Sequence, residues 1–178
     1  SCCDGPVVAV LGFHADALRG AAPAGVTVVV NADPARGMLS SLQCGLAETL
    51  AADNVFFTPV DFPAIQPDTI ASLKDVAGAI VIPRFKGERG HPVRISAGVR
   101  AELLALPPTA RTHDVIRARV AEHVYVDIDD PGVTFDVDDF VQPTSKIAAD
   151  TKVNIGIKKQ PVIVFASYRK SNQSPDKR

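Results

Sequence analysis

The chain has 178 residues, 46% of them hydrophobic and 22% charged, with a formal net charge of −1 at pH 7. These values are typical of one globular domain with a sizeable core, and they exclude a global basic field that would attract nucleic acid. No apolar run approaches the roughly 20 residues of a membrane-spanning helix and no secretory signal is visible, so we expect a cytoplasmic protein without nucleic-acid or membrane partners.

The first half of the chain alternates short apolar strands with helices. Strands are predicted at 7–11, 26–30, 55–60 and 79–82, the last broken by Pro83, and helices at about 15–19, 38–52 and 67–76. This alternation is typical of βαβ units with a mostly parallel sheet, which indicates the α/β class.

The pattern changes after Pro83. Residues 84–92 form a predicted basic loop with two glycines, helices are predicted at 97–106 and 111–122, and a short strand at 124–126. An acid-rich segment follows, and the chain from about residue 143 is polar and Lys-rich except for an apolar stretch at 161–166. We therefore expect a main domain over residues 1–142 and a C-terminal extension over 143–178.

Asp61 is the first candidate for chemistry. It directly follows the predicted strand 55–60 and precedes a turn marked by Pro63. Open α/β sheets bind ligands at the carboxyl ends of their strands, and Mg²⁺ prefers carboxylates that it shares with substrate phosphates. The alternative is that Asp61 only caps the following turn.

Two further features could converge with Asp61. Asp136 and Asp138 alternate in the late acidic segment, so only one of them would face the same way as Asp61. The loop from Gly37 to Ser40 and Ser41 would present backbone N–H groups and hydroxyls at a helix N-terminus, which favours anion binding. The acidic segment could instead be a solvated turn, and the two serines could be ordinary helix caps.

A set of motifs resembles the MobA-like nucleotidyltransferases, and within them most closely the molybdopterin cytidylyltransferase branch. The motifs span about residues 5–142 and are Val-Val-Ala-Val-Leu-Gly (7–12), Gly-Met-Leu-Ser-Ser-Leu (37–42), Val-Asp-Phe-Pro (60–63), Gly-Glu-Arg-Gly-His-Pro (87–92) and Asp-Val-Asp (136–138). The resemblance implies a Rossmann-like three-layer sandwich of the nucleotide-diphospho-sugar transferase type. It also implies Mg²⁺-dependent transfer of a nucleoside monophosphate from CTP, or GTP, to a phosphorylated acceptor such as molybdopterin, with release of pyrophosphate.

The resemblance assigns roles to individual residues. Asp61 would be the first metal ligand, and Asp136 or Asp138 the second. Ser41 would help to read the nucleobase, while the loop around Gly90 and His91 would face the acceptor. Local cations that could neutralise phosphate charge are Arg84, Lys86, Arg89 and Lys177, and we assign Arg89 to acceptor binding. His91 could otherwise be an ordinary surface turn residue.

One departure from the family is large. The family opens with a strand and a Gly-rich loop that grips the triphosphate, and residues 1–6 leave no room for them. The stretch 162–177 fits the same register, as in a circular permutation, and would bring Lys177 to the phosphates, although Tyr168 and Ser174 stand where the family has glycine. The alternatives are a non-catalytic nucleotide- or cofactor-binding homologue and a sugar-phosphate nucleotidyltransferase.

Overall fold

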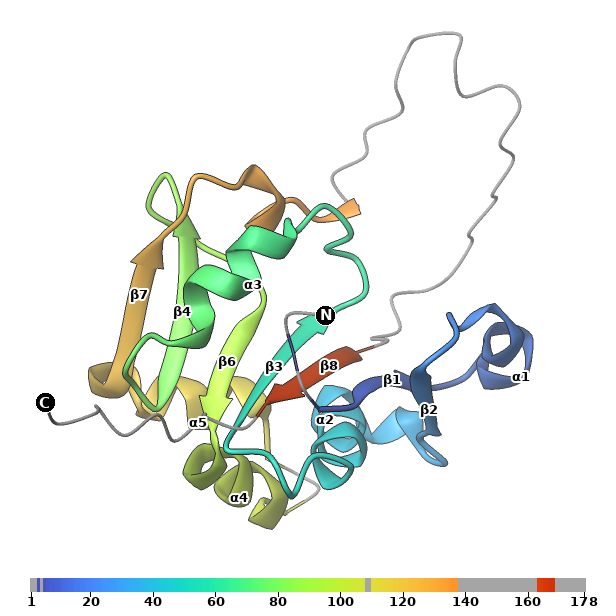
Figure 1. Ribbon diagram of the computed structural model, residues 1–178. Helices are drawn as coiled ribbons and strands as arrows, with labels where there is room; N and C mark the ends of the chain where they lie inside the picture. The colour runs from blue at the N-terminus through green and yellow to red at the C-terminus, as the bar shows by residue number, and fades with distance from the viewer. Residues whose placement is uncertain (1–2, 4, 108–109, 138–162, 169–178) are drawn as a thin grey trace, which may run out of the picture.

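The computed structural model describes residues 3, 5–107, 110–137 and 163–168, and shows a mixed α/β fold (Figure 1). The strands are β1 (Val7–Leu11), β2 (Val26–Val30), β3 (Asn54–Pro59), β4 (Ile80–Phe85), β5 (Glu88–Arg89), β6 (Val93–Ser96), β7 (His123–Asp127) and β8 (Ile163–Tyr168). The α-helices are α1 (Ala15–Leu18), α2 (Met38–Ala47), α3 (Pro67–Lys74), α4 (Ala97–Ala105) and α5 (Thr112–Ala118). Four short 3₁₀ turns complete the described elements: η1 (Arg19–Ala21), η2 (Pro34–Arg36), η3 (Val120–Glu122) and η4 (Pro131–Val133).

All eight described strands form one sheet in the order β2-β1-β8-β3-β6-β4-β5, with β7 also paired to β4. The pairs β1–β2 and β4–β7 are parallel, whereas β8 and β6 pair antiparallel with their neighbours on both sides. The expected α/β class is confirmed, but the expectation of a mostly parallel sheet is wrong. The reason is that β6 and β8 each separate two strands that would otherwise be neighbours.

The pairing pattern nevertheless fixes a common direction for β1, β2, β3, β4 and β7. Two successive antiparallel pairings through β8 make β1 and β3 point the same way, and two through β6 do the same for β3 and β4. The carboxyl ends of these five strands therefore share one edge of the sheet, which is where α/β sheets bind ligands.

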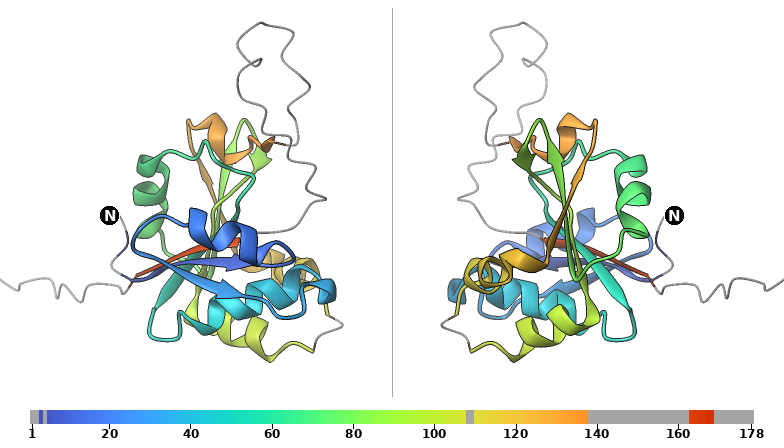
Figure 2. Two further views of the ribbon diagram at one scale, coloured as in Figure 1. Left: turned by 90° about the vertical axis from the view of Figure 1, so that its right-hand side faces the viewer. Right: turned by 90° about the vertical axis from the view of Figure 1, so that its left-hand side faces the viewer.

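Helices cover both faces of the sheet, which gives the three expected layers (Figures 1 and 2). On one face, α2 and α4 bury Leu42, Leu46 and Leu103 against Val55 and other strand residues. On the opposite face, Leu73 of α3 packs with the buried residues of a smaller cluster, Cys3, Phe56 and Val81. Neighbouring residues of β3 thus face opposite layers, as the two-residue repeat of a strand requires.

Several elements differ from the expected ones. β4 continues through Pro83 to Phe85, because the missing N–H of Pro83 falls where pairing with β6 has ended and pairing with β5 has not begun. The expected basic loop is mostly a hairpin, β4–β5, in which Lys86 and Gly87 form the turn and both have positive φ. Strand β6 was not expected, and α2 ends at Ala47 rather than near residue 52.

Strand β8 lies in the middle of the sheet, hydrogen-bonded to β1 on one side and to β3 on the other (Figure 1). It is antiparallel to both, whereas a strand that replaced the family's first strand by permutation would run parallel to them. Its last residue, Tyr168, lies beside Asn54 at the start of β3, so the chain leaves β8 at the edge opposite to Asp61. Among the described residues, no helix is long and apolar enough to cross a membrane.

Candidate active site

Asp61 and the late acidic segment lie side by side at the shared strand edge. β3 ends at Pro59, and Asp61 follows after Val60. The carbonyl oxygen of Asp61 accepts a hydrogen bond from the Val137 N–H at 3.0 Å. This bond places Asp136, the residue before Val137, next to the turn that carries Asp61. Both carboxylate residues are partly buried, which strengthens their field relative to a fully solvated pair.

His91 belongs to the same cluster. Its ring lies 4.5 Å from the Phe62 ring, measured between centroids, with the planes tilted by 51°. Burial lowers the pKa of His91 to about 4, although a backbone hydrogen bond with Phe57 and the charge of Asp136 act in the opposite direction. The ring is therefore neutral at neutral pH, and it lies close enough to Asp136 to sense its charge.

One buried atom of His91 points to a ligand. Among the described residues, its Nδ1 is buried and has no hydrogen-bond partner. Buried polar atoms in native proteins are nearly always paired, and exceptions concentrate at functional sites. The backbone of His91 is tied to the segment after β7, since its N–H donates to the Val133 carbonyl at 2.8 Å.

The loop before α2 has a different arrangement from the expected one. Gly37 is the N-cap residue of α2, with a φ of 92° that favours glycine, so Ser40 and Ser41 are not helix caps. Both serines are buried, and the side-chain amide of Asn31 donates to their hydroxyl oxygens at 2.8 and 3.0 Å. Asn31 thus joins the end of β2 to the first turn of α2.

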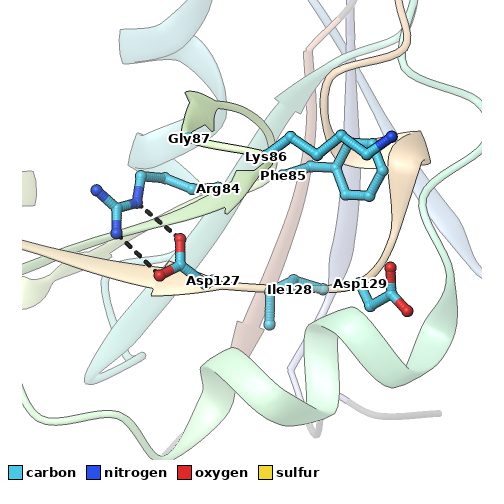
Figure 3. A pocket seen from close by; sticks show the side chains of 7 residues that line it. All are labelled: Arg84, Phe85, Lys86, Gly87, Asp127, Ile128 and Asp129. Carbon is cyan, nitrogen blue, oxygen red and sulfur yellow. Dashed lines mark hydrogen bonds and ion pairs between the residues drawn. The ribbon is translucent and has the colours of Figure 1, made fainter.

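A cavity lined by two basic and two acidic side chains lies at the carboxyl ends of β4 and β7 (Figure 3). It has a volume of about 590 Å³ and is lined by Arg84, Phe85, Lys86, Gly87, Asp127, Ile128 and Asp129. Asp127 accepts two hydrogen bonds from Arg84 at 3.0 and 2.9 Å, so the charge of this guanidinium is largely compensated, whereas Lys86 lies over the Phe85 ring. Arg89 lies over the ring of Tyr125 in β7.

The structure thus brings together Asp61, Asp136, Gly90 and His91. Asp138 and Lys177 lie outside the described residues. Within the described part of the chain, no three His, Cys, Asp or Glu side chains converge on one point as a metal site made of protein alone would require. Mg²⁺ sites often use only one or two carboxylates and complete their coordination with phosphates and water, so the Asp61–Asp136 pair suits that kind of site.

The sequence interpretation missed three contributors. Phe62 packs on His91, Asn31 fixes the α2 loop, and Asp130 is a buried carboxylate that joins two loops of the site. Only the last had a readable signal, because an Asp-Pro-Gly segment after a strand predicts a tight turn in which the Asp side chain bonds nearby backbone.

A family model, the MobA-like NTP transferase domain, matches residues 1–124. This chain belongs to that family. Family membership makes it a nucleotidyltransferase, and confirms the resemblance found in the motifs. No curated protein matches the chain.

Three solved structures with related folds come from mycobacteria. The crystal structure of Rv0371c from Mycobacterium tuberculosis H37Rv is 29% identical, with a TM-score of 0.59, and the match covers 75% of this chain and 72% of that one. A complex of Rv0371c with manganese is also 29% identical, with a TM-score of 0.55 and 68% coverage of both chains. A homologue from Mycobacterium sp. strain JC1, 22% identical with a TM-score of 0.57, covers 69% of this chain and 64% of its own and shows the shared fold.

Proposed function

We propose that this chain transfers a nucleoside monophosphate from CTP or GTP to a phosphorylated acceptor such as molybdopterin, with a divalent cation held by Asp61 and Asp136. The observation that carries the proposal is the hydrogen bond from the Val137 N–H to the Asp61 carbonyl, which holds two carboxylate-bearing turns together. Family membership supports the reaction class.

The donor set fits a hard divalent cation. Two carboxylates supply oxygen ligands and leave positions for phosphate oxygens, which is the usual arrangement for Mg²⁺ in phosphoryl-transfer sites. The related Rv0371c was crystallised with manganese, which also prefers oxygen ligands. When bound, such an ion would neutralise triphosphate charge and orient its phosphates.

The residues of the chain would supply positioning and polar contacts. The N-terminus of α2 presents backbone N–H groups with no partner inside the helix, and these favour a nucleotide edge or phosphate. We assign the base-reading role to this loop, with Ser40 and Ser41 holding its shape through Asn31 rather than pointing outward. Neutral His91 can donate or accept a hydrogen bond to the acceptor.

The cavity between β4 and β7 is our candidate for the acceptor phosphate, although its lining also holds two carboxylates, Asp127 and Asp129. It opens at the same sheet edge as Asp61, and the ammonium of Lys86 is the cation in its lining that is not held by a carboxylate in the contacts described above. Arg84 is compensated by Asp127, so it contributes hydrogen-bond donors more than net charge.

The test is calorimetric titration of CTP and GTP into the chain with and without Mg²⁺. We expect Mg²⁺-dependent binding that is lost in Asp61→Asn and weakened in Asp136→Asn, with the tighter nucleotide identifying the substrate. Asp75→Asn is the matched control, because this carboxylate is exposed and lies at the C-terminal end of α3, away from the strand edge that carries Asp61. If the control lost Mg²⁺-dependent nucleotide binding to the same extent as Asp61→Asn, the loss would be a general effect of charge, and the metal assignment would be contradicted.

One observation favours a second candidate, a nucleotide-binding homologue that does not catalyse transfer. The chain leaves β8 at the edge opposite to Asp61, which does not support a triphosphate-gripping tail like that of the permutation hypothesis. Binding of CTP or GTP without pyrophosphate release in the presence of acceptor would favour this candidate over the enzyme.

A further inference from the structure

Asp130 lies at the centre of a hydrogen-bond network behind the candidate metal site. Its side chain is only 2% exposed. Oδ2 accepts hydrogen bonds from the Gln66 N–H at 2.9 Å and from the Thr69 hydroxyl at 2.6 Å, while Oδ1 accepts from the Gly132 N–H at 2.8 Å. Gln66 is the N-cap residue of α3 and makes no side-chain cap of its own, so a residue from a distant segment caps this helix.

The same network reaches both carboxylate-bearing turns. The segment 61–66 is held to the segment 130–137 at its two ends, by Gln66 to Asp130 and by Asp61 to Val137. Between these points Val133 accepts the His91 N–H, which attaches the acceptor loop to the same segment. Three loops of the site are thus connected through residues 130–137.

Close packing leaves the three loops little freedom. A Cβ atom at Gly132 would overlap the Ala64 carbonyl, and one at Gly90 would overlap the Val133 carbonyl. Each glycine allows direct backbone contact between two of the loops. A shift of the Asp130 turn therefore has to move the segments that carry Asp61 and His91.

We propose that Asp130 is a positioning residue that sets the distance between Asp61 and Asp136 by fixing the turn 130–133 against the start of α3. This proposal rests on the function proposed above for Asp61 and Asp136. Burial alone would raise the pKa of Asp130, but the hydrogen bonds from Thr69, Gln66 and Gly132 lower it below its ordinary value, so the carboxylate is ionised at neutral pH. It would act through geometry, without touching metal or substrate.

The competing explanation is that Asp130 only caps α3. A cap alone would affect the stability of that helix and leave the acceptor loop and the Asp61–Val137 bond unchanged. The two explanations therefore differ in what happens at His91 and Val137, which are far from α3 in sequence.

The test compares Asp130→Asn and Thr69→Val with the control Thr49→Val. Thr69 and Thr49 are both 2% exposed and both donate a short hydrogen bond, but Thr49 bonds Leu46 at the end of α2, by the opposite edge of the sheet. Thr69→Val keeps the Asp130 carboxylate and two of its three hydrogen-bond donors. It can therefore test the proposal even if Asp130→Asn fails to fold. The measurements are amide hydrogen exchange of the full chain and its affinity for Mn²⁺ alone.

We expect faster exchange at the His91 and Val137 amides in both site variants, and a Mn²⁺ dissociation constant raised about tenfold, as for residues that orient metal ligands. Thr49→Val should change neither. Faster exchange confined to the first turn of α3, or an unchanged Mn²⁺ affinity, would overturn the positioning role. If the unmodified chain bound no Mn²⁺, the metal proposal would fail, and the exchange at His91 and Val137 would still decide whether Asp130 couples the loops.

Discussion

His91 shows at the scale of a single residue how burial and function compete. Its ring is packed on Phe62 with a buried Nδ1, and its pKa is lowered to about 4 from an ordinary value near 6.5. The folded chain therefore resists a proton that the unfolded chain accepts readily. Folding is penalised as the pH falls below about 6.5, and the penalty is complete near pH 4.

We expect His91→Gln to flatten this part of the pH dependence. In metal-free buffer the free energy of unfolding of the unmodified chain should fall between pH 7 and pH 4 by up to about 3 kcal/mol more than that of the variant, since each pKa unit corresponds to about 1.4 kcal/mol. Urea unfolding at several pH values measures this difference. The exposed His14, changed in the same way, is the control, and an identical pH profile for His91→Gln and the unmodified chain would contradict the assignment.

At the scale of elements, the two-residue turn of the β4–β5 hairpin contributes Lys86 and Gly87 to the lining of the cavity. Phe85 pairs with Glu88, so Lys86 and Gly87 are the turn residues, with φ values of 51° and 87°. Two consecutive positive φ values are typical of a type I′ turn, which prefers Asn-Gly because only Asn, Asp and Gly tolerate the first position well. Lys86 therefore occupies the first turn position at some cost in stability.

Two substitutions in the hairpin turn should change the free energy of unfolding in opposite directions. Lys86→Asn should raise the free energy of unfolding by a few tenths of a kcal/mol to about 1 kcal/mol, and Gly87→Ala should lower it by about 1 kcal/mol. Denaturant unfolding measures both effects. If Lys86 also binds the acceptor phosphate, Lys86→Asn should raise the KM for the acceptor while leaving nucleotide affinity unchanged, and a loss of nucleotide affinity would place Lys86 in the other site.

The strands that sequence patterns predicted well are those with Val-rich runs. Residues 7–11 and 26–30 were predicted with their observed bounds, because β-branched side chains favour extended backbone both in the largely buried β1 and in the partly exposed β2. β6 was missed because it contains a charged residue, Arg94, in a buried position. Its guanidinium donates hydrogen bonds to the Lys74 and Gly78 carbonyls, and these partners can be identified only in the three-dimensional structure. For the same reason the position of Asp61 was predictable from a strand end, whereas the role of Asp130 was not.

At the scale of the whole molecule, β8 connects two parts of the sheet. β1 and β2 lie on one side of it, and β3, β6, β4, β5 and β7 on the other. The described ladder contains no direct pairing between β1 and β3, so the backbone hydrogen bonds between the two parts all pass through β8. This arrangement was not readable from the apolar stretch 161–166, because local patterns do not indicate the partner or the direction of a strand.

Truncation after residue 142 tests this arrangement. We expect the shortened chain to lose several kcal/mol of stability or to aggregate, because two long strand edges would lose their partners in the middle of the sheet. Urea unfolding and size-exclusion chromatography measure the two outcomes. A truncated chain as stable and monomeric as the full one would show that the extension over 143–178 is not part of the folded domain.

The central position of β8 also bears on how the chain is made. β1 ends at Leu11 and β8 begins at Ile163, so the strand that joins the two parts of the sheet leaves the ribosome long after β1. At about 5–20 residues per second, β1 waits on the order of ten seconds or more before its partner exists. During that interval its apolar edge is open to other nascent chains, and we expect expression of this protein to depend on translation speed and on chaperones that shield exposed strands.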